Sequence, residues 1–346
     1  MKIKLLFIFL LSIHFIAFGA PKNDWVVVSN GNKLRCEIKT LKENKIVCKT
    51  TNFGTVSVKW DRVTHVYSKN TFRIELRNGM LLTGSLDSTE IDRVVRILET
   101  KDSLWTEVPT AEIVAMYQIN QSIFEQIDGT LGVGYSFTKS SNIHSFNGKT
   151  TLQYLAKKNL LEFNANGIYT MQSDTITTSK SEVHIQDQHL FHNNWFTTIG
   201  WSIQQNTELG LRARNIGTIT YGKYLIKENQ TFLSLSFGGA VNNERYYENE
   251  NGVTKTAQLN YEGVISLGFR AFTNNTPEFN IYPTWIVYPS FTQAGRWRSD
   301  FNIESRLEIY HNIYVTLSYY NQFDNKPPDS GTKVDFGFVG SVDWKF

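Results

Sequence analysis

Residues 332–346, TKVDFGFVGSVDWKF, decide the fold of this chain because they alternate apolar and polar side chains. Successive side chains on a β-strand point to opposite faces. This segment therefore predicts a long strand with one apolar and one polar face. The apolar face carries Val334, Phe336, Phe338, Val342, Trp344 and Phe346, and the polar face carries Lys333, Asp335, Ser341, Asp343 and Lys345.

The same alternation recurs upstream, as far as residue 126. The segment near residue 181 is the weakest, because Asp187 and His189 stand among its apolar positions. An even number of antiparallel strands is typical of single-chain bacterial barrels. A soluble sandwich, which would bury the apolar faces, is the alternative. The segments start near residues 128, 143, 160, 181, 195, 210, 230, 253, 278, 296, 313 and 332, which makes twelve.

Three features favour a transmembrane barrel over the sandwich. The segments match the ~9–11 residues of a tilted membrane-spanning strand. Loops alternate between tight ones, such as 156–159, and longer ones, such as 324–331, as expected of the two ends of a barrel. Aromatic side chains near strand ends suit the membrane interface. These are Trp195, Tyr224, Trp297, Tyr310 and Trp344.

The first nineteen residues predict a signal peptide. Lys2 and Lys4 precede an apolar run over residues 5–18, which is too short to span a membrane and suits a secretory signal. An uncleaved N-terminal anchor is the less favoured alternative. We therefore expect an exported protein with its barrel, residues 126–346, in the outer membrane. Because the strand number is even, both ends of the barrel should face the periplasm.

Residues 20–119 predict a small periplasmic β module with two weak repeats. Asn30-Gly31 recurs 48 residues later as Asn78-Gly79, and each pair stands between apolar runs. Asn-Gly is a strong hairpin signal, for which we expect a positive φ at both residues. The fold class is therefore all-β: this module followed by a twelve-stranded antiparallel barrel.

Cys36 and Cys48 flank the turn around residues 42–44 and are the only cysteines. An exported protein meets an oxidising compartment, which makes a disulfide between them one alternative. Two unpaired buried thiols are the other. The two cysteines lack the neighbouring histidine pair of a zinc site.

The stretch at residues 128–142, DGTLGVGYSFTKSSN, resembles the opening of the salt-induced outer-membrane protein family. The unit around Asn30, Gly31 and residues 54–60, GTVSVKW, is similar to a module that some members carry. Trp344 and Phe346 resemble the terminal aromatic signature of bacterial outer-membrane proteins, which guides barrel assembly. The resemblance implies an outer-membrane location, contact with lipid and with the barrel-assembly machinery, and no particular catalytic residue.

Other chemistry finds little support. The 35 basic and 32 acidic residues give a net charge of +3, which does not favour nucleic acid as a partner. His144 and Ser145 are adjacent, so on a strand they point to opposite faces and cannot act together. His184 and His189 face opposite ways for the same reason. We expect no enzyme activity, no cofactor and no metal.

A ladder of charges is expected to point into the barrel: Arg298, Asp300, Glu304, Arg306 and Glu308. It predicts either a salt-bridged plug or a polar pore lining. Inward tyrosines favour a narrow or filled lumen. These are Tyr282, Tyr288, Tyr310, Tyr314 and Tyr320. The predicted function is a non-enzymatic outer-membrane barrel, either a narrow channel or a stress-related envelope component. The alternative is an envelope scaffold whose module binds peptidoglycan or a periplasmic partner.

Overall fold

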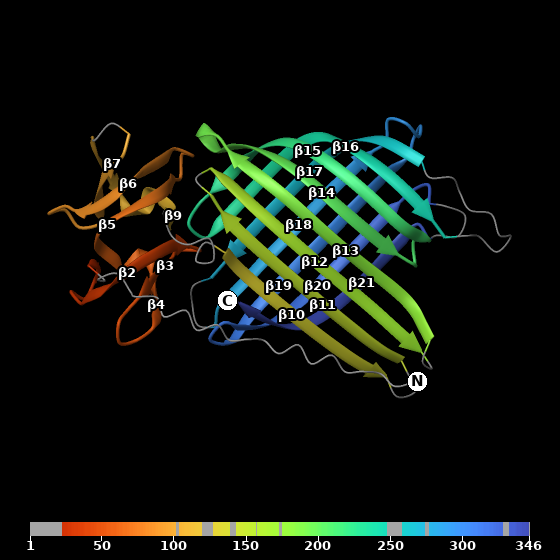
Figure 1. The fold of residues 1–346 in the computed structure, drawn as a ribbon, viewed down its shortest axis with the longest axis horizontal. Helices are drawn as coiled ribbons and strands as arrows, with labels where there is room; N and C mark the ends of the chain where they lie inside the picture. The colour runs from red at the N-terminus through yellow and green to blue at the C-terminus, as the bar shows by residue number, and fades with distance from the viewer. Residues whose placement is uncertain are drawn as a thin grey trace, which may run out of the picture.

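The structure is a computed structural model that describes residues 23–101, 104–119, 127–138, 143–156, 158–172, 175–247, 258–273, 277–327 and 332–345. Within these ranges the regular elements are strands and short 3-10 turns. No helix in this part of the chain is long and apolar enough to cross a membrane. The predicted signal peptide, residues 1–19, lies outside the described residues. The chain forms a small β module followed by a barrel (Figure 1).

The second body is a closed antiparallel barrel, which confirms the predicted architecture. The first and last of its strands pair directly, from Thr130 opposite Lys345 to Val133 opposite Val342. The twelve strands are β10 (Ile127–Thr138), β11 (Ile143–Leu155), β12 (Asn159–Gln172), β13 (Thr175–Leu190), β14 (Trp195–Asn206), β15 (Leu211–Lys227), β16 (Thr231–Tyr246), β17 (Gln258–Phe272), β18 (Phe279–Pro289), β19 (Trp297–Tyr310), β20 (Ile313–Asp324) and β21 (Val334–Lys345).

The segment with the weakest alternation still forms a full strand, β13. It starts at Thr175, six residues before the expected position, and pairs with β12 along its length. Its polar outliers are satisfied at the strand end: Asn159 Nδ2 donates to Asp187 Oδ2 at 2.6 Å, and Asn159 Oδ1 lies 2.9 Å from His189 Nδ1. Pairing with neighbouring strands therefore overrides a poor local pattern.

The outer surface of the barrel is apolar, and the inner surface is polar. On β16, Phe237 is 55% exposed while its neighbour Ser236 faces inward and is buried. On β20, Leu317 is 54% exposed and Thr316 is fully buried. This inside-out distribution, on a closed sheet without a free edge, is what a membrane-spanning barrel requires.

The module is a nine-stranded sheet in the order β4-β3-β2-β1-β5-β6-β7-β8, with β9 pairing with β2 and β5. Its core includes the fully buried Val26, Ile38, Phe72, Ile97 and Ile113. The strands are β1 (Asp24–Val28), β2 (Lys33–Lys42), β3 (Lys45–Lys49), β4 (Thr55–Lys59), β5 (Val63–Leu76), β6 (Leu81–Ser88), β7 (Val94–Glu99), β8 (Trp105–Pro109) and β9 (Ile113–Gln118).

The two repeats meet at matching 3-10 turns, η1 (Trp60–Arg62) and η2 (Thr110–Glu112). The indole Nε1 of Trp60 in the first turn donates to the Thr110 carbonyl of the second at 2.8 Å. Trp60 is buried, so this bond fixes the two halves around one core.

The two Asn-Gly turns differ from the expectation in one respect. Only the glycines take a positive φ, +82° at Gly31 and +83° at Gly79. Each asparagine side chain instead accepts a backbone hydrogen bond, Asn30 from Asn32 and Asn78 from Met80. The expectation of two left-handed residues was wrong because these loops are longer than a two-residue turn, and the asparagine caps the loop with its side chain.

Cys36 and Cys48 are free thiols in the structure, and both are buried. Cys48 lies opposite Ile38 across β2 and β3, so the two cysteines are offset by two positions rather than directly paired. The neighbouring Cys36 thiol, together with burial, raises the pKa of Cys48. Of the two alternatives, the structure therefore has the two unpaired buried thiols.

The apolar exterior gives a direct test. Changing Phe237→Arg in the middle of β16 should lower the unfolding free energy of the vesicle-inserted protein by ~2–4 kcal/mol. The reason is that a guanidinium must then lie in hydrocarbon. Chemical denaturation in lipid vesicles would measure this.

The matched control is Phe53→Arg in the module, where Phe53 is 77% exposed. Its effect should be close to zero because no lipid surrounds it. Equal effects of the two substitutions would contradict a lipid-facing exterior.

Candidate functional site

The barrel encloses a cavity of about 690 Å³. Its lining is mostly polar and comes from all twelve strands, with residues such as Asn164, Glu182, Thr218 and Ser266. Because these side chains alternate with the outward apolar ones, the period that makes the exterior apolar also makes the lumen polar. The cavity is therefore the natural candidate for a functional site.

Some charges in the cavity are paired and others are not. Lys149 Nζ bridges Glu304 at 2.9 Å and Asp343 at 2.7 Å. By contrast, Glu162 accepts hydrogen bonds from the amides of Gln153, Asn164 and Gln186 but has no cation within 4.0 Å in the described part of the chain. The lumen thus offers both fixed ion pairs and solvated carboxylates to a solute.

Six charged residues close the barrel at the end where the long loops lie. We call Arg214, Glu244, Glu262, Arg296, Arg298 and Asp324 the ion-pair layer; each of them is less than a tenth exposed.

Glu244 is the hub of the ion-pair layer. Its carboxylate accepts from Arg214 at 2.8 Å and from both terminal nitrogens of Arg296 at 2.8 and 3.1 Å. Arg296 also contacts Asp324 at 2.6 Å, and Arg298 contacts Glu262 at 2.6 Å. The layer meets the cavity lining at Tyr288, whose ring centroid lies 4.6 Å from the Arg298 guanidinium.

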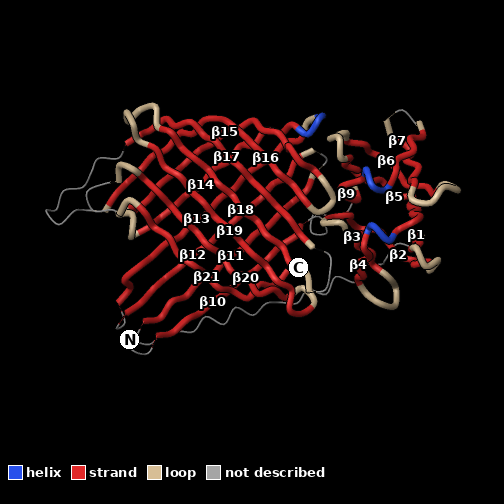
Figure 2. Tube along the Cα trace, turned by 180° about the vertical axis from the view of Figure 1, so that it is seen from behind, coloured by secondary structure: helices blue, strands red, loops and turns tan. Residues whose placement is uncertain are grey.

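The module closes the opposite end of the barrel. Both views show it beside the end of β21, where the tight turns of the barrel lie (Figure 1 and Figure 2). Its closest approach is the hairpin tip, residues 42–45, which joins β2 to β3. Glu43 and Asn44 take φ of 53° and 59°, as in the tight turns that favour twisted hairpins. This geometry directs Glu43 into the barrel mouth, where it lines the cavity.

Ion pairs hold the module against the barrel. Lys345 Nζ lies 3.3 Å from Glu43 Oε2, and Lys42 Nζ lies 3.0 Å from Asp128 Oδ2.

Three further contacts hold the sides of the module. Lys227 contacts Glu75 at 3.1 Å, and Arg73 donates to the carbonyl of Ala156 at 2.6 Å. Lys45 also pairs with Glu278. The module therefore lies across one mouth of the lumen, and the ion-pair layer lies toward the other end.

The structure distributes the predicted charge ladder over three places. Asp300, Glu304 and Arg306 line the cavity. Arg298 belongs to the ion-pair layer. Glu308 lies outside the cavity, near the module, and accepts a backbone hydrogen bond from Asn312 at 3.2 Å.

Four of the five predicted inward tyrosines line the cavity, and Tyr310 does not. Tyr310 is 72% exposed because a bulge between Glu308 and Tyr310 shifts the register. Tyr224, expected at the membrane interface, also faces inward and donates to Gln188 at 2.9 Å. Trp344 lies outward, opposite Leu131 and Ile313, whereas Phe346 lies outside the described residues.

Two closures were missed by sequence reasoning. Glu244 and Glu262 occupy inward positions of β16 and β17, and strand parity alone would have placed them in the lumen. Their arginine partners lie on other strands, so the pairing needed the barrel geometry. The contact of Glu43 with Lys345 joins residues 302 positions apart and left no local signal.

His144 and Ser145, which the sequence places on opposite faces of a strand, have separate hydrogen-bond partners in the structure. His144 Nδ1 lies 2.9 Å from the Tyr135 hydroxyl on the outer face, whereas Ser145 Oγ accepts from Thr170 at 3.5 Å. Among the described residues, no group of three His, Cys, Asp or Glu side chains is arranged to hold a metal ion.

A family model described as "Protein of unknown function, DUF481" matches residues 129–339. The chain belongs to this family. The match spans almost the whole barrel of this DUF481 member and includes most of the stretch that resembles salt-induced outer-membrane proteins. A search of curated proteins found no match.

Among solved structures, this DUF481 chain is similar to three barrels at low identity. The structure titled as the NanC porin is 9% identical, with 63% of this chain and 96% of that chain covered and a TM-score of 0.37. The β domain of the Bordetella autotransporter BrkA is 11% identical, with 64% and 97% covered and a TM-score of 0.33. A porin refined at 1.8 Å is 8% identical, with 64% and 99% covered and a TM-score of 0.27.

Breaking the ion-pair layer should be costly. Glu244→Gln leaves Arg214 buried without a carboxylate and leaves Arg296 with Asp324 alone, and we expect a loss of about 3–5 kcal/mol of unfolding free energy. Denaturation in lipid vesicles would measure it. The control is Glu107→Gln, which breaks an exposed pair with Arg96 at 2.8 Å and should cost no more than about 1 kcal/mol. Similar losses for both would show that the layer is not a buried network.

The module contact should depend on acid. Burial alone would raise the pKa of Glu43, but Lys345 and Lys42 outweigh burial and lower it from a usual 4.5 to about 2. A lowered carboxyl pKa stabilises docking above pH 4.5, and that stabilisation is lost as the pH falls toward 2. Hydrogen exchange of residues 40–46 should therefore accelerate in that window, after correction for the intrinsic rate. Glu43→Gln should remove this acid-dependent acceleration. If the acceleration were unchanged in the variant, it would not arise from protonation of Glu43.

Proposed function

We propose that this protein is a narrow channel of the outer membrane for small polar solutes, and that both of its ends are closed in the state seen here. One observation carries the proposal: a polar cavity of about 690 Å³ runs between the ion-pair layer and the docked module. A barrel that served only as a structural element would have no need of such a cavity. Hydrated side chains such as Glu162 and Thr218 suit the passage of solutes that carry their own hydrogen-bonding groups.

The two closures suggest gating at both ends. The ion-pair layer belongs to the barrel wall and to the loops around it. The module is a separate body, and some of its contacts with the barrel are partly exposed ion pairs, such as Lys42 with Asp128, whereas Lys227 with Glu75 is buried. In the proposed open state the module tilts away from the mouth while it stays tethered before β10.

The proposed orientation follows from the apolar exterior and the even number of strands. Residues 1–19 would direct export, and the module would lie in the periplasm. Trp344 and Phe346 would present the terminal signal to the barrel-assembly machinery, and the outer apolar belt would contact lipid. No catalytic role is proposed. The salt-induced character suggested by the resemblance would be tested by comparing protein levels in low and high salt.

A second role has one observation in its favour. Leu104 and Trp105, at the edge strand β8 of the module, are 65% and 51% exposed, away from the barrel. An exposed aromatic edge suits an envelope scaffold that binds peptidoglycan or a periplasmic protein. Retention of the full-length protein on peptidoglycan, lost in Trp105→Ala, would support this role over the channel.

Planar bilayers would test the channel. Two closures in series predict that the wild type and each single opening variant conduct little, whereas the combination conducts several-fold more. Glu244→Gln weakens the ion-pair layer. Glu43→Lys places a third cation beside Lys345 and Lys42, which repels the hairpin tip.

The exposed variant Glu107→Gln serves as the control and should behave as the wild type. Heat-modifiable gel mobility would confirm that each variant is folded. No current from the folded double variant would reject the channel.

A further inference from the structure

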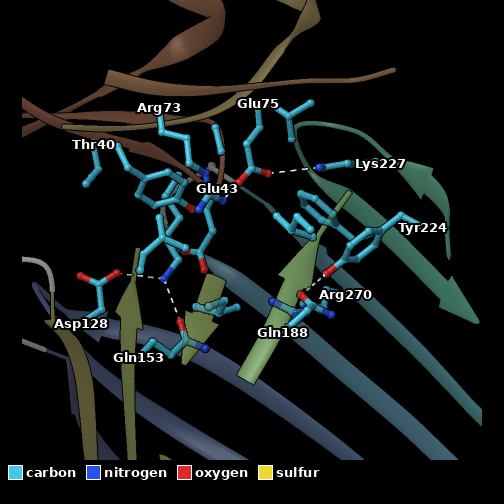
Figure 3. Close-up of a pocket in the computed structure, with 18 of the residues that line it drawn as sticks. Thr40, Glu43, Arg73, Glu75, Asp128, Gln153, Gln188, Tyr224, Lys227 and Arg270 are labelled. Carbon is cyan, nitrogen blue, oxygen red and sulfur yellow. Dashed lines mark hydrogen bonds and ion pairs between the residues drawn. The ribbon is translucent and has the colours of Figure 1, made fainter. Parts of the chain in front are cut away.

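A second, smaller cavity of about 140 Å³ lies at the joint between the module and the barrel. Figure 3 shows side chains from both bodies converging on it, with Arg73 and Glu75 at the top, Lys227 and Tyr224 at the right, and Arg270 below. This joint pocket shares Arg270 and Tyr224 with the lumen lining, so it opens toward the main cavity. A solute in the lumen therefore has access to it.

The joint pocket carries more positive than negative charge. Arg73 and Lys227 share a single carboxylate, that of Glu75. Arg73 is 2% exposed, and its Nε has no hydrogen-bond partner. Arg270 forms no ion pair within 4.0 Å among the described residues, although the carboxylates of Glu162 and Glu43 lie farther off on its side of the lumen, and its side chain is exposed in the cavity lining. The other carboxylates of the pocket already have cations, Asp128 with Lys42 and Glu43 with Lys345.

An unpartnered buried guanidinium nitrogen and an unpaired arginine favour an anion. Carboxylates suit both, because arginine presents several donors in one plane.

Part of the remaining wall of the joint pocket is apolar, beside polar side chains such as Thr40 and Gln188. Leu155, Leu190, Phe232 and Phe272 come from the barrel, and Val114 comes from the module. Leu190 and Phe272 are each 7% exposed, so a ligand here contacts dry surface as well as cations. A fully hydrated ion such as phosphate would leave that apolar surface unused.

We propose that the joint pocket binds a small carboxylate that bears an apolar group, and that this ligand holds the module on the barrel. Its carboxylate would reach Arg73 of the module and Arg270 of the barrel, and its apolar part would rest on Leu190 and Phe272. A ligand that contacts both bodies binds the docked state better than the undocked one and therefore shifts the population toward closure. This regulatory step rests on the proposed channel, whereas the binding site itself does not.

Calorimetry on the full chain in lipid nanodiscs would test the site, with benzoate as the probe and empty nanodiscs as the blank. We expect saturable benzoate binding at pH 7. Benzamide, which has the ring without the charge, and acetate, which has the charge without the ring, should both bind at least tenfold more weakly. Inorganic phosphate should do the same.

Arg270→Gln should weaken benzoate binding at least about tenfold, because one charge-assisted contact is lost. Arg270→Lys, which keeps the charge without the planar fork, should recover part of the affinity. The control is Arg212→Gln at the far end of β15, an exposed residue outside the pocket, which should leave affinity unchanged. Since Arg270 has no ion pair to break, its replacement should leave the fold intact.

Several results would overturn the proposal. One is a calorimetric titration with benzoate that shows no saturable binding. Another is equal benzoate affinity in Arg270→Gln and the wild type, and a third is phosphate that binds as tightly as benzoate. Hydrogen exchange of residues 40–46 should slow when benzoate is added, and unchanged exchange with benzoate bound would refute the coupling to docking. Benzoate binding in a protein whose double opening variant never conducts would reject the channel and leave the site standing.

Discussion

The structure depends on one constraint: a chain inside a membrane must satisfy every backbone N–H and C=O by itself. A closed sheet does so, and the pairing of β10 with β21 removes the free edges. Once the sheet is closed, alternate side chains must face lipid and lumen. The apolar exterior and the polar cavity are therefore two results of a single requirement. Charged side chains are found inside because the inward positions of the strands do not face lipid.

The two closures of the lumen differ in physical kind. In the ion-pair layer, Glu244 is fully buried between Arg214 and Arg296, so removing its charge leaves Arg214 buried without a carboxylate. At the other end, the pairs of the hairpin tip are partly exposed, such as Lys345 with Glu43, whereas Lys227 and Glu75 form a buried pair between the two bodies. The module is therefore held by a mixture of partly exposed and buried contacts, whereas the layer is buried throughout.

Period-two alternation was sufficient to predict the barrel, its twelve strands and most of their starts, because burial on a barrel depends on parity alone. It failed where parity is reset, as at the bulge that turns Tyr310 outward. It also could not pair charges on different strands, because the partner of Glu262, Arg298, is fixed by strand tilt and stagger rather than by sequence distance. The docked module and the joint pocket depend on contacts such as that of Arg73 with Ala156, which have no local sequence signal.

Lys345 lies on the strand that shuts the barrel, and its partner Glu43 belongs to the body that precedes the barrel in the chain. The full set of docking contacts can form only after the last strand has joined the first. The N-terminal body, although synthesised earlier, therefore lacks its contact with Lys345 until the C-terminal strand is in place. Complete docking of the module thus requires a barrel whose first and last strands have paired.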